Sequence, residues 1–369
     1  MEGLQATMNE AFSHALALRD RLHEIPEASG CEVMTKQLLM DDLKDVCEVH
    51  DCGKWFYAVQ REEGAKSSLC FRADMDAVSS GDGTVYHGCG HDGHMSVMAA
   101  LAHELAGRQL GKNLFFLFQH AEETGEGAKD ASGIFDRENI DAIFGFHNCP
   151  GFPEGAILFR DDVFACASRG LILTFNGVQS HAAYPENGRN PAFPMAAVLS
   201  QLPEISDPRR YQGMILATPV GFGAGGRAFG VAAGRGELCL TLRAWYDQDL
   251  EKLEETVFET ACRESAKLGI TVTREETEVF SATRNDPQIL RIAEKAAETA
   301  GLKVIALKEP FRWSEDFGCY GTRTKAFYFG VGGGENAAGL HTPEYQWNDC
   351  VTRSALKFLT TLAEQPSRL

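Results

Sequence analysis

Leu114-Phe-Phe-Leu-Phe-Gln119 is a nearly continuous apolar run that ends just before two adjacent carboxylates, Glu122 and Glu123. A short run so rich in Leu and Phe is typical of a strand that is buried on both faces of a sheet. A second apolar run, residues 140–146, ends just before His147. Because both runs lead directly into side chains that can bind metal, we expect an α/β domain whose site lies at the carboxyl ends of its strands.

Upstream of the first run, Cys89-Gly-His91-Asp92-Gly-His94 places three possible metal ligands within six residues. Thiolate and imidazole suit zinc, iron, copper or nickel, and a neighbouring carboxylate can hold water beside the ion. His341 adds another imidazole near the end of the chain. A single Cys or His is more often structural than a ligand, but this combination with the Glu pair predicts a metal-dependent hydrolase.

The candidate ligands are one thiol, one carboxylate and three imidazoles: Cys89, Glu123, His91, His147 and His341. Five side chains exceed the roughly three that one catalytic ion takes from a protein, so two divalent ions per subunit are expected. Zinc, manganese, cobalt and nickel all tolerate such a set. One residue of the adjacent Glu pair is expected to bind metal, while its neighbour acts as general base on the attacking water.

Two aspartates follow a third predicted strand, residues 68–73. Asp74 and Asp76 stand at its carboxyl end, where they could orient the imidazoles of the metal ligands. Ordinary turn chemistry at a strand end is the alternative interpretation. We expect Asp76 in particular to assist catalysis in this indirect way.

The chain has 369 residues, a net charge of −17 and 24% charged residues, which is ordinary for a soluble globular protein. Its length favours two domains, and its acidity argues against nucleic acid or an anionic membrane surface as a partner. No apolar run approaches the ~20 residues of a membrane span, and the N-terminal segment contains no signal-peptide core. The eleven cysteines lack paired spacing, as expected of reduced thiols, so a cytoplasmic location is predicted.

The order of the predicted elements indicates a small domain inserted into a larger one. Residues 166–279 are predicted to form a strand-helix-strand-strand-helix-strand series, the split βαβ arrangement. Residues 1–165 and 280–369 carry the metal-binding candidates and form the predicted catalytic domain. Within the insert, Gly221-Phe-Gly223-Ala-Gly-Gly226 matches a dinucleotide-binding string, but no helix start follows it, so a hairpin connection is the better interpretation.

Five sequence blocks, in this order, resemble the aminoacylase/carboxypeptidase family of metallopeptidases. Within that family they are similar to the branch of hippurate hydrolases, auxin-conjugate (IAA-amino acid) hydrolases and bacterial N-acyl-amino-acid amidohydrolases. The similarity spans nearly the whole chain, and Cys-Gly-His-Asp-Gly-His with a later Glu-Glu is highly specific to that branch. The blocks are residues 19–27, 71–77, 87–94 and 118–123, and Ser314-Glu-Asp-Phe317 with Leu340-His341.

The resemblance implies a zinc-exopeptidase-like α/β/α catalytic domain with an inserted ferredoxin-like lid that forms a homodimer. By position, all five candidate ligands match the family's metal ligands, and Glu122 matches its general base. His181, in the insert, matches a family histidine that reaches across the dimer to stabilise the oxyanion. A surface or loop histidine is the alternative interpretation of His181.

Departures from the family pattern concern the substrate more than the mechanism. His120 stands where the family usually has Pro, and residues 77–81 form a shorter continuation than usual. In the lid, Gly230-Val-Ala-Ala233 replaces the usual Asn-Val-Ile-Pro, whose Asn commonly helps to hold the substrate carboxylate. Arg243 is then the remaining residue expected to bind the substrate carboxylate, although an ion pair on the lid surface is an equally good interpretation of this arginine.

The sequence therefore predicts an amidohydrolase of the aminoacylase or hippurate hydrolase type, with an N-acyl-amino acid or short peptide as its substrate. A dipeptidase or carboxypeptidase, or a deacetylase of an N-acetyl-diamino acid, is the alternative that the altered lid run motivates. A catalytically silent protein that keeps the fold and the metal is a third possibility. The intact set of ligand positions argues against this last alternative.

Overall fold

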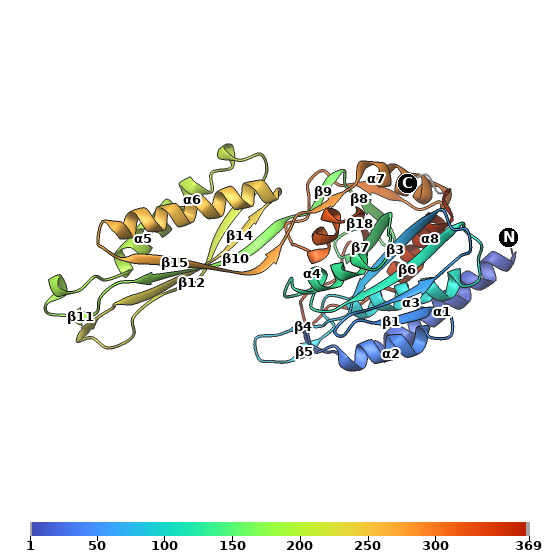
Figure 1. The fold of residues 1–369 in the computed structure, drawn as a ribbon, viewed down its shortest axis with the longest axis horizontal. Helices are drawn as coiled ribbons and strands as arrows, with labels where there is room; N and C mark the ends of the chain where they lie inside the picture. The colour runs from blue at the N-terminus through green and yellow to red at the C-terminus, as the bar shows by residue number, and fades with distance from the viewer. Residues whose placement is uncertain (1, 367–369) are drawn as a thin grey trace. The chain divides into compact units, whose positions relative to one another are not determined.

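The computed structural model describes the backbone of residues 2–366 and the side chains of residues 8–366. The chain divides into two compact units, whose helices and strands are labelled in Figure 1. Unit 1 comprises Met1–Phe164, Thr283–Pro310 and Glu315–Leu369, and unit 2 comprises Ala165–Ala282 and Phe311–Ser314.

The short segment Phe311–Ser314 belongs to unit 2, whereas the sequence analysis assigned it to the catalytic domain. The N–H of Cys166 donates to the carbonyls of Phe311 and Trp313, at 3.1 and 3.2 Å. The rings of Phe311 and Trp313 stack with 4.7 Å between their centroids. Contacts between residues as far apart in the sequence as Cys166 and Phe311 leave no trace in local apolar periodicity, so the sequence pattern does not reveal this grouping.

Unit 1 is built on an eight-stranded sheet with the strand order β1-β2-β6-β3-β7-β18-β8-β17. Its central strands, β6, β3, β7 and β18, are parallel and almost entirely buried, as expected of strands covered by helices on both faces. The strands predicted at 68–73, 114–119 and 140–146 are confirmed as β3, β6 and β7. The bounds are β1 (Glu48–Asp51), β2 (Phe56–Gln60), β3 (Ser67–Asp74), β6 (Lys112–Gln119), β7 (Ala142–Cys149), β8 (Ile157–Phe159), β17 (Val304–Ala306) and β18 (Lys325–Gly332).

Long helices cover one face of this sheet, and shorter ones cover the other (Figure 1). Phe327 belongs to the large apolar core that the long helices share with the sheet. The next residue of the strand, Tyr328, points to the opposite face, where its ring lies 4.7 Å from that of Phe317. Unit 1 is therefore the expected α/β/α domain. The long helices are α1 (Glu2–His23), α2 (Val33–Leu43), α3 (His91–Leu105), α7 (Pro287–Thr299) and α8 (Asp349–Glu364), and the short ones are α4 (Gly127–Ala131) and η4 (Asp316–Thr322).

The carboxyl ends of the parallel strands lie at one edge of the sheet. Asp74 and Gln119, the last residues of β3 and β6, are direct partners across the two strands. β7 carries His147 near its own carboxyl end, and α3 begins at His91. This arrangement brings candidate residues from distant parts of the sequence to the edge where α/β proteins place their sites.

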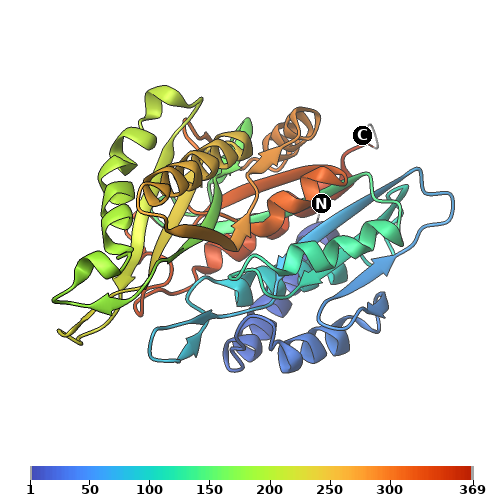
Figure 2. The ribbon, with the colours of Figure 1, turned by 60° about the vertical axis from the view of Figure 1, so that its left-hand side comes forward.

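Unit 2 contains the predicted strand-helix-strand-strand-helix-strand series. Its four-stranded sheet has the order β12-β14-β10-β15, and every neighbouring pair is antiparallel. Both helices pack on one face of the sheet, so residues along β10 and β14 alternate between buried and less buried (Figure 2). Residues 221–224 belong to β12, and only residues 225 and 226 lie in the predicted connection to β14. The bounds are β10 (Ala167–Asn176), α5 (Ala192–Ile205), β12 (Ile215–Ala224), β14 (Arg235–Ala244), α6 (Asp247–Ala266) and β15 (Thr271–Phe280).

Two further observations concern the chain as a whole. Among the helices of the described residues, none has the length and hydropathy needed to cross a membrane. All eleven cysteines are free thiols, distributed from buried to exposed positions.

Candidate metal centre

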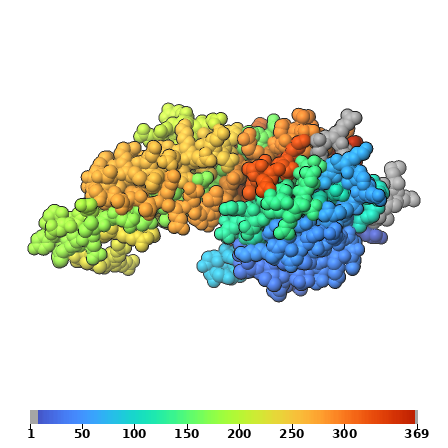
Figure 3. Space-filling model, in the orientation of Figure 1, coloured from blue at the N-terminus to red at the C-terminus, as the bar shows by residue number. Residues whose placement is uncertain are grey.

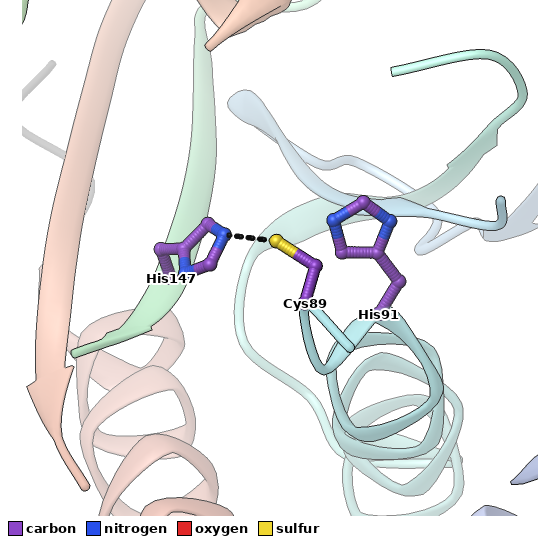
Figure 4. Close-up of side chains that lie close together, drawn as sticks. All are labelled: Cys89, His91 and His147. Atoms are coloured by element: carbon purple, nitrogen blue, oxygen red, sulfur yellow. Dashed lines mark hydrogen bonds between the residues drawn. The ribbon is translucent and has the colours of Figure 1, made fainter. Parts of the chain in front are cut away.

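Cys89 lies at the centre of the cluster of predicted ligands. Its Sγ atom is 3.3 Å from Nε2 of His147 and 3.3 Å from Nε2 of His341. Figure 4 shows Cys89 and His91 at the start of α3, with the imidazole of His147 reaching the thiol from β7. Three segments that are far apart in the sequence therefore meet at one buried sulfur atom.

Both members of the Glu pair face this cluster, but they have different neighbours. Glu123 Oε1 lies 3.4 Å from Nε2 of His341 and 3.7 Å from Nε2 of His91. Glu122 Oε2 lies 4.0 Å from the same His91 atom, while Glu122 Oε1 accepts a hydrogen bond from the N–H of Asp316 at 3.4 Å. Glu123 therefore lies between the imidazoles of His341 and His91, whereas Glu122 lies between His91 and the backbone of Asp316.

The six predicted residues form overlapping groups, and two of these groups share Cys89. One consists of Cys89, His91 and His147, and the other of Cys89, Glu123 and His341. Within each group the candidate ligand atoms lie within 4.8 Å of one another. A thiolate common to two such groups could bridge two metal ions.

Two buried polar atoms support the fit of a metal ion to this cluster. Nε2 of His91 and Oε1 of Glu123 have no hydrogen-bond partner among the described residues. Leaving a polar atom buried and unpaired costs about 1–3 kcal/mol, so two such atoms 3.7 Å apart need a common partner. A divalent cation would be such a partner, since imidazole and carboxylate are both suitable ligands for first-row metals.

The imidazoles are held in the tautomer that metal binding requires. Nδ1 of His91 lies 2.9 Å from the backbone carbonyl of Asp76, and Nδ1 of His147 lies 2.8 Å from the carbonyl of Asn148. A carbonyl can only accept, so each Nδ1 must carry the proton, which leaves Nε2 as the ring atom available to a metal ion.

The side chain of Asp76 supports two of the candidate ligands. Its Oδ1 lies 3.3 Å from Nδ1 of His91, and its Oδ2 accepts hydrogen bonds from Ser29 Oγ at 2.6 Å and from the N–H of Glu123 at 3.0 Å. These contacts have the geometry of the orienting role predicted for this residue.

His94, the third possible ligand of the Cys-Gly-His-Asp-Gly-His motif, faces away from the cluster. Its Nδ1 lies 2.7 Å from Asp74 Oδ1, and its Nε2 lies 2.8 Å from Asn148 Oδ1. Both ring nitrogens are thus bonded to protein oxygens. Asp74 accordingly orients the imidazole of His94, which packs beneath the candidate ligands.

Arg72, a buried arginine close to the candidate centre, was not predicted from the sequence to take part in it. Arg72 lies 2.7 Å from Asp74, 2.7 Å from Asp316 and 3.1 Å from Glu315, and it also donates to Gln119 at 2.9 Å. It is therefore the cation that compensates three buried carboxylates. The sequence did contain an indication of this role, because an arginine in a strand that is buried on both faces needs a buried acidic partner.

Burial sets the protonation of several groups in the cluster. It raises the pKa of Glu122 well above its ordinary value, and the neighbouring Glu315 and Glu123 carboxylates raise it further. Burial likewise raises the pKa of the Cys89 thiol and lowers the pKa of His147. The imidazole of His147 is thus neutral, and the thiol needs a nearby cation to ionise.

Two residues at the centre adopt left-handed backbone conformations that are uncommon outside glycine. Ala121, which precedes the Glu pair, has φ 49°, and His341 has φ 61°. Each backbone is held by hydrogen bonds: the N–H of Ala121 donates to Glu32 at 2.8 Å, and the N–H of His341 to the carbonyl of Gly88 at 2.8 Å. Strain of this kind concentrates at functional sites.

His181 and Arg243, the two predicted site residues of the insert, belong to unit 2, whereas the candidate metal ligands belong to unit 1. His181 is exposed and pairs with Val231 in a two-stranded sheet, and the N–H of Ala182 donates to the carbonyl of Gly230 at 2.9 Å. The lid run that departs from the family pattern is therefore the strand that supports His181. Neither the pairing of His181 with Val231 nor the hydrogen bond from Ala182 to Gly230 could be predicted from the sequence.

Arg243, the predicted carboxylate anchor, has only neutral hydrogen-bond acceptors in the described residues. Its Nη1 donates to the carbonyl of Arg312 at 2.9 Å and to Ser314 Oγ at 3.0 Å. These two hydrogen bonds hold the guanidinium in place, but neither acceptor carries a negative charge that would neutralise it.

Comparison with known proteins agrees with this geometry. Residues 70–365 match the model of peptidase family M20/M25/M40. An uncharacterised hydrolase of Staphylococcus epidermidis is 30% identical over 355 residues, which cover 90% of this chain and 92% of the relative. A solved dinuclear metal-binding peptidase of the M20 family from Bacillus subtilis has a TM-score of 0.82 at 22% identity, covering 96% of this chain and 98% of that one. An aminobenzoyl-glutamate utilisation protein from Klebsiella pneumoniae has a TM-score of 0.76 at 20% identity, with 98% of both chains covered.

These matches confirm the predicted fold class and the family-level resemblance. They do not separate the hippurate and auxin-conjugate hydrolases from other members, because the relatives are named only as hydrolases or share too little sequence. The chain belongs to peptidase family M20/M25/M40, and it is a metal-dependent hydrolase that acts on amide bonds.

Proposed function

We propose that the protein hydrolyses the amide bond of an N-acyl-amino acid and releases a carboxylic acid and an amino acid. The observation that carries this proposal is the convergence of five ligand-type side chains, Cys89 among them, with Glu122 Oε2 4.0 Å from Nε2 of His91. Amide hydrolysis requires a group that deprotonates water and then protonates the leaving nitrogen. A buried carboxyl beside a metal cluster has the chemistry for both steps.

In the proposed centre, Cys89 and the four other candidate ligands would hold two divalent ions, since Cys89 belongs to both groups of ligand atoms. When bound, such ions polarise the substrate carbonyl and the attacking water. His91 and His147 would supply neutral Nε2 atoms, and their Nδ1 contacts keep both rings in position. Zinc, manganese, cobalt and nickel all fit a set of thiolate, imidazole and carboxylate.

The two glutamates have different proposed roles. Glu123 Oε1, which lacks a hydrogen-bond partner among the described residues, is the proposed metal ligand. Glu122 is the proposed general base, which takes a proton from water and passes it to the departing nitrogen. Its raised pKa, caused by burial and by nearby carboxylates, favours the protonated form that the second step needs.

Recognition of the amino-acid part is assigned to Arg243. Its guanidinium is held by two neutral acceptors, so a substrate carboxylate would be its counter-ion. The Klebsiella pneumoniae protein of similar fold is named for aminobenzoyl-glutamate, which is itself an N-acyl-amino acid. This likeness favours the N-acyl-amino acid class of substrates.

His181 is proposed to hydrogen-bond the oxyanion that develops on the substrate carbonyl, from the second subunit of a homodimer. Its side chain is exposed and not directed into the core of unit 2. Unit 2 also exposes large apolar side chains, among them Phe193, Phe222 and Phe229. Exposed apolar surface of this kind is typical of a subunit interface.

A dipeptidase or carboxypeptidase, or an N-acetyl-diamino-acid deacetylase, is the second candidate. The run from Gly230 to Ala233 favours it, because this run pairs directly with the strand of His181 and lacks the usual carboxylate-binding Asn. A catalytically silent homologue is not favoured, since Glu122 is retained next to His91.

The test is amine release from a panel of N-acetyl-amino acids, N-benzoyl-amino acids and free dipeptides, with and without a chelator. Each N-acyl-amino acid is paired with its carboxamide, which lacks the carboxylate proposed to meet Arg243. We expect chelator-sensitive release from the N-acyl-amino acids, and much slower release from the carboxamides. Preferential cleavage of dipeptides would support the second candidate. Equal cleavage of acids and carboxamides would exclude Arg243 as the anchor.

A further inference from the structure

We propose that the protein has a second metal site, separate from the catalytic centre, formed by His14, Asp42 and His103 on three different helices. Asp42 Oδ2 lies 3.1 Å from Nε2 of His14 and 3.0 Å from Nε2 of His103. The two imidazole rings have centroids 4.3 Å apart. All three candidate ligand atoms lie within 4.8 Å of one another.

The packing of the helices preorganises this cluster. His14 is on α1, Asp42 on α2 and His103 in the last turn of α3, and α3 packs against both of the other helices. The Asp42 side chain is only 8% exposed, whereas those of His14 and His103 are 32% and 28% exposed. A buried carboxylate with two accessible imidazoles leaves a path for an ion from solvent, and α2 itself forms part of the surface seen in Figure 3.

The distances and ligand types suit zinc. In a tetrahedral site with bonds of about 2.0–2.1 Å, neighbouring ligand atoms are roughly 3.3 Å apart, close to the spacing around Asp42 Oδ2. Two imidazoles and one carboxylate leave a fourth position for water or another ligand. Glu10 is the candidate for this position, because it lies four residues before His14 on the same face of α1. It lines the same surface cleft of about 500 Å³ as His14 and His103.

The proposed site is distinct from the catalytic centre. His91 and His103 are both on α3, and twelve residues of helix at 1.5 Å each separate them by about 18 Å. Zinc bound here would link α1, α2 and α3, so its effect would be to stabilise the packing of unit 1.

The test is the zinc content of the full chain after removal of metal, reloading with zinc chloride and dialysis. The variants are His14→Asn and His103→Asn. The matched control is His50→Asn, because His50 is also a surface histidine with a carboxylate partner, Glu48, at 2.9 Å. We expect each of the two variants to bind about one zinc ion fewer per chain than the wild type and the control. Equal zinc content in all four proteins would overturn the proposal.

Zinc anomalous diffraction from crystals of the reloaded wild-type chain tests the proposal without any substitution. We expect a peak within bonding distance of Nε2 of both His14 and His103, in addition to any peak at the catalytic centre. Zinc at the catalytic centre and none at the His14–Asp42–His103 cluster would overturn the proposal. This outcome does not depend on whether the variants fold. Failure of the proposed amidohydrolase activity would leave this outcome unaffected.

Discussion

The Nδ1 atom of His91 lies 2.9 Å from the backbone carbonyl of Asp76. The same aspartate receives the N–H of Glu123 on its carboxylate at 3.0 Å, so a single residue fixes two candidate ligands through different atoms. The backbone contact does not depend on the side chain, and asparagine would keep an acceptor oxygen for the N–H of Glu123 while removing the negative charge. Substitution of this side chain therefore isolates the contribution of its charge to metal binding.

Replacement of Asp76 by Asn should lower metal affinity by about 10- to 100-fold, as expected when a carboxylate that supports a histidine ligand loses its charge. Affinity is measured by competition with a chromogenic chelator. Asp130→Asn is the control, because Asp130 is an exposed carboxylate that faces His120 at 3.4 Å, away from the ligand cluster. Equal affinity in the two variants would show that the charge of Asp76 has no part in holding metal.

Glu122→Gln and Glu123→Gln form a matched pair that separates proton transfer from metal binding. We expect Glu122→Gln to keep its metal and to lose about 10²–10⁴-fold in kcat, because an amide cannot accept the proton from water. Glu123→Gln should instead lose bound metal. Metal content by elemental analysis and turnover of the best panel substrate are measured on the same samples. Comparable turnover in Glu122→Gln would remove this residue from the mechanism.

Replacement of Arg72 by Met should destabilise unit 1 by roughly 3–5 kcal/mol, because three buried carboxylates would lose their common cation. The control is Arg61→Met, which breaks an ion pair with Glu138 at a position 46% exposed and should cost at most about 1 kcal/mol. Thermal unfolding midpoints of both variants and the wild type provide the comparison. Similar midpoints for the two variants would contradict the structural role given to Arg72.

The Asp42–His103 pair should stabilise the protein within a defined pH window. Its hydrogen bond raises the pKa of His103 above the ordinary 6.5, so this contribution is complete below about pH 6.5 and is lost as the pH rises through the folded value. Burial opposes ionisation of Asp42, but the bonds from both histidines lower its pKa below the ordinary 3.8, so its contribution is lost only in stronger acid. The window therefore runs from about pH 4 to about pH 6.5.

In the presence of a chelator, the difference in thermal midpoint between wild type and Asp42→Asn should be largest between about pH 4 and about pH 6.5, and it should shrink as the pH rises through the raised pKa of His103. Both proteins lose any bound metal under these conditions, so the comparison reports the proton-dependent pair alone. A difference that stays constant from acid to alkaline pH would show that Asp42 stabilises the fold by packing only.

The strands of unit 1 could be predicted from the sequence because their burial on both faces leaves continuous Leu, Phe and Ile runs. The start of α3 was harder to predict. The apolar spacing indicates a helix from Met95, but the structure begins it at His91, directly after Gly90 with φ 92°. At this position a Cβ atom would lie 2.9 Å from Asn148 Oδ1, which only the folded structure reveals.

The types of the site residues were visible in the sequence, but their partners were not. The motif offers His91 and His94 as equivalent ligands, and only the structure shows that Asp74 and Asn148 occupy both nitrogens of His94. Arg72 was conspicuous in a buried strand, yet one of its partners, Asp316, is separated from it by the entire insert. Local periodicity contains no information on such long-range pairs.

The position of β18 in the sheet has a consequence for biosynthesis. β18 pairs with β7, the strand of His147, although all of Ala165–Ala282 is translated between them. Until β18 leaves the ribosome, one edge of β7 is an unpaired apolar strand of the kind that promotes aggregation. His341 is translated later still. The five candidate ligands are therefore all present only after His341 has been translated, well after the other four.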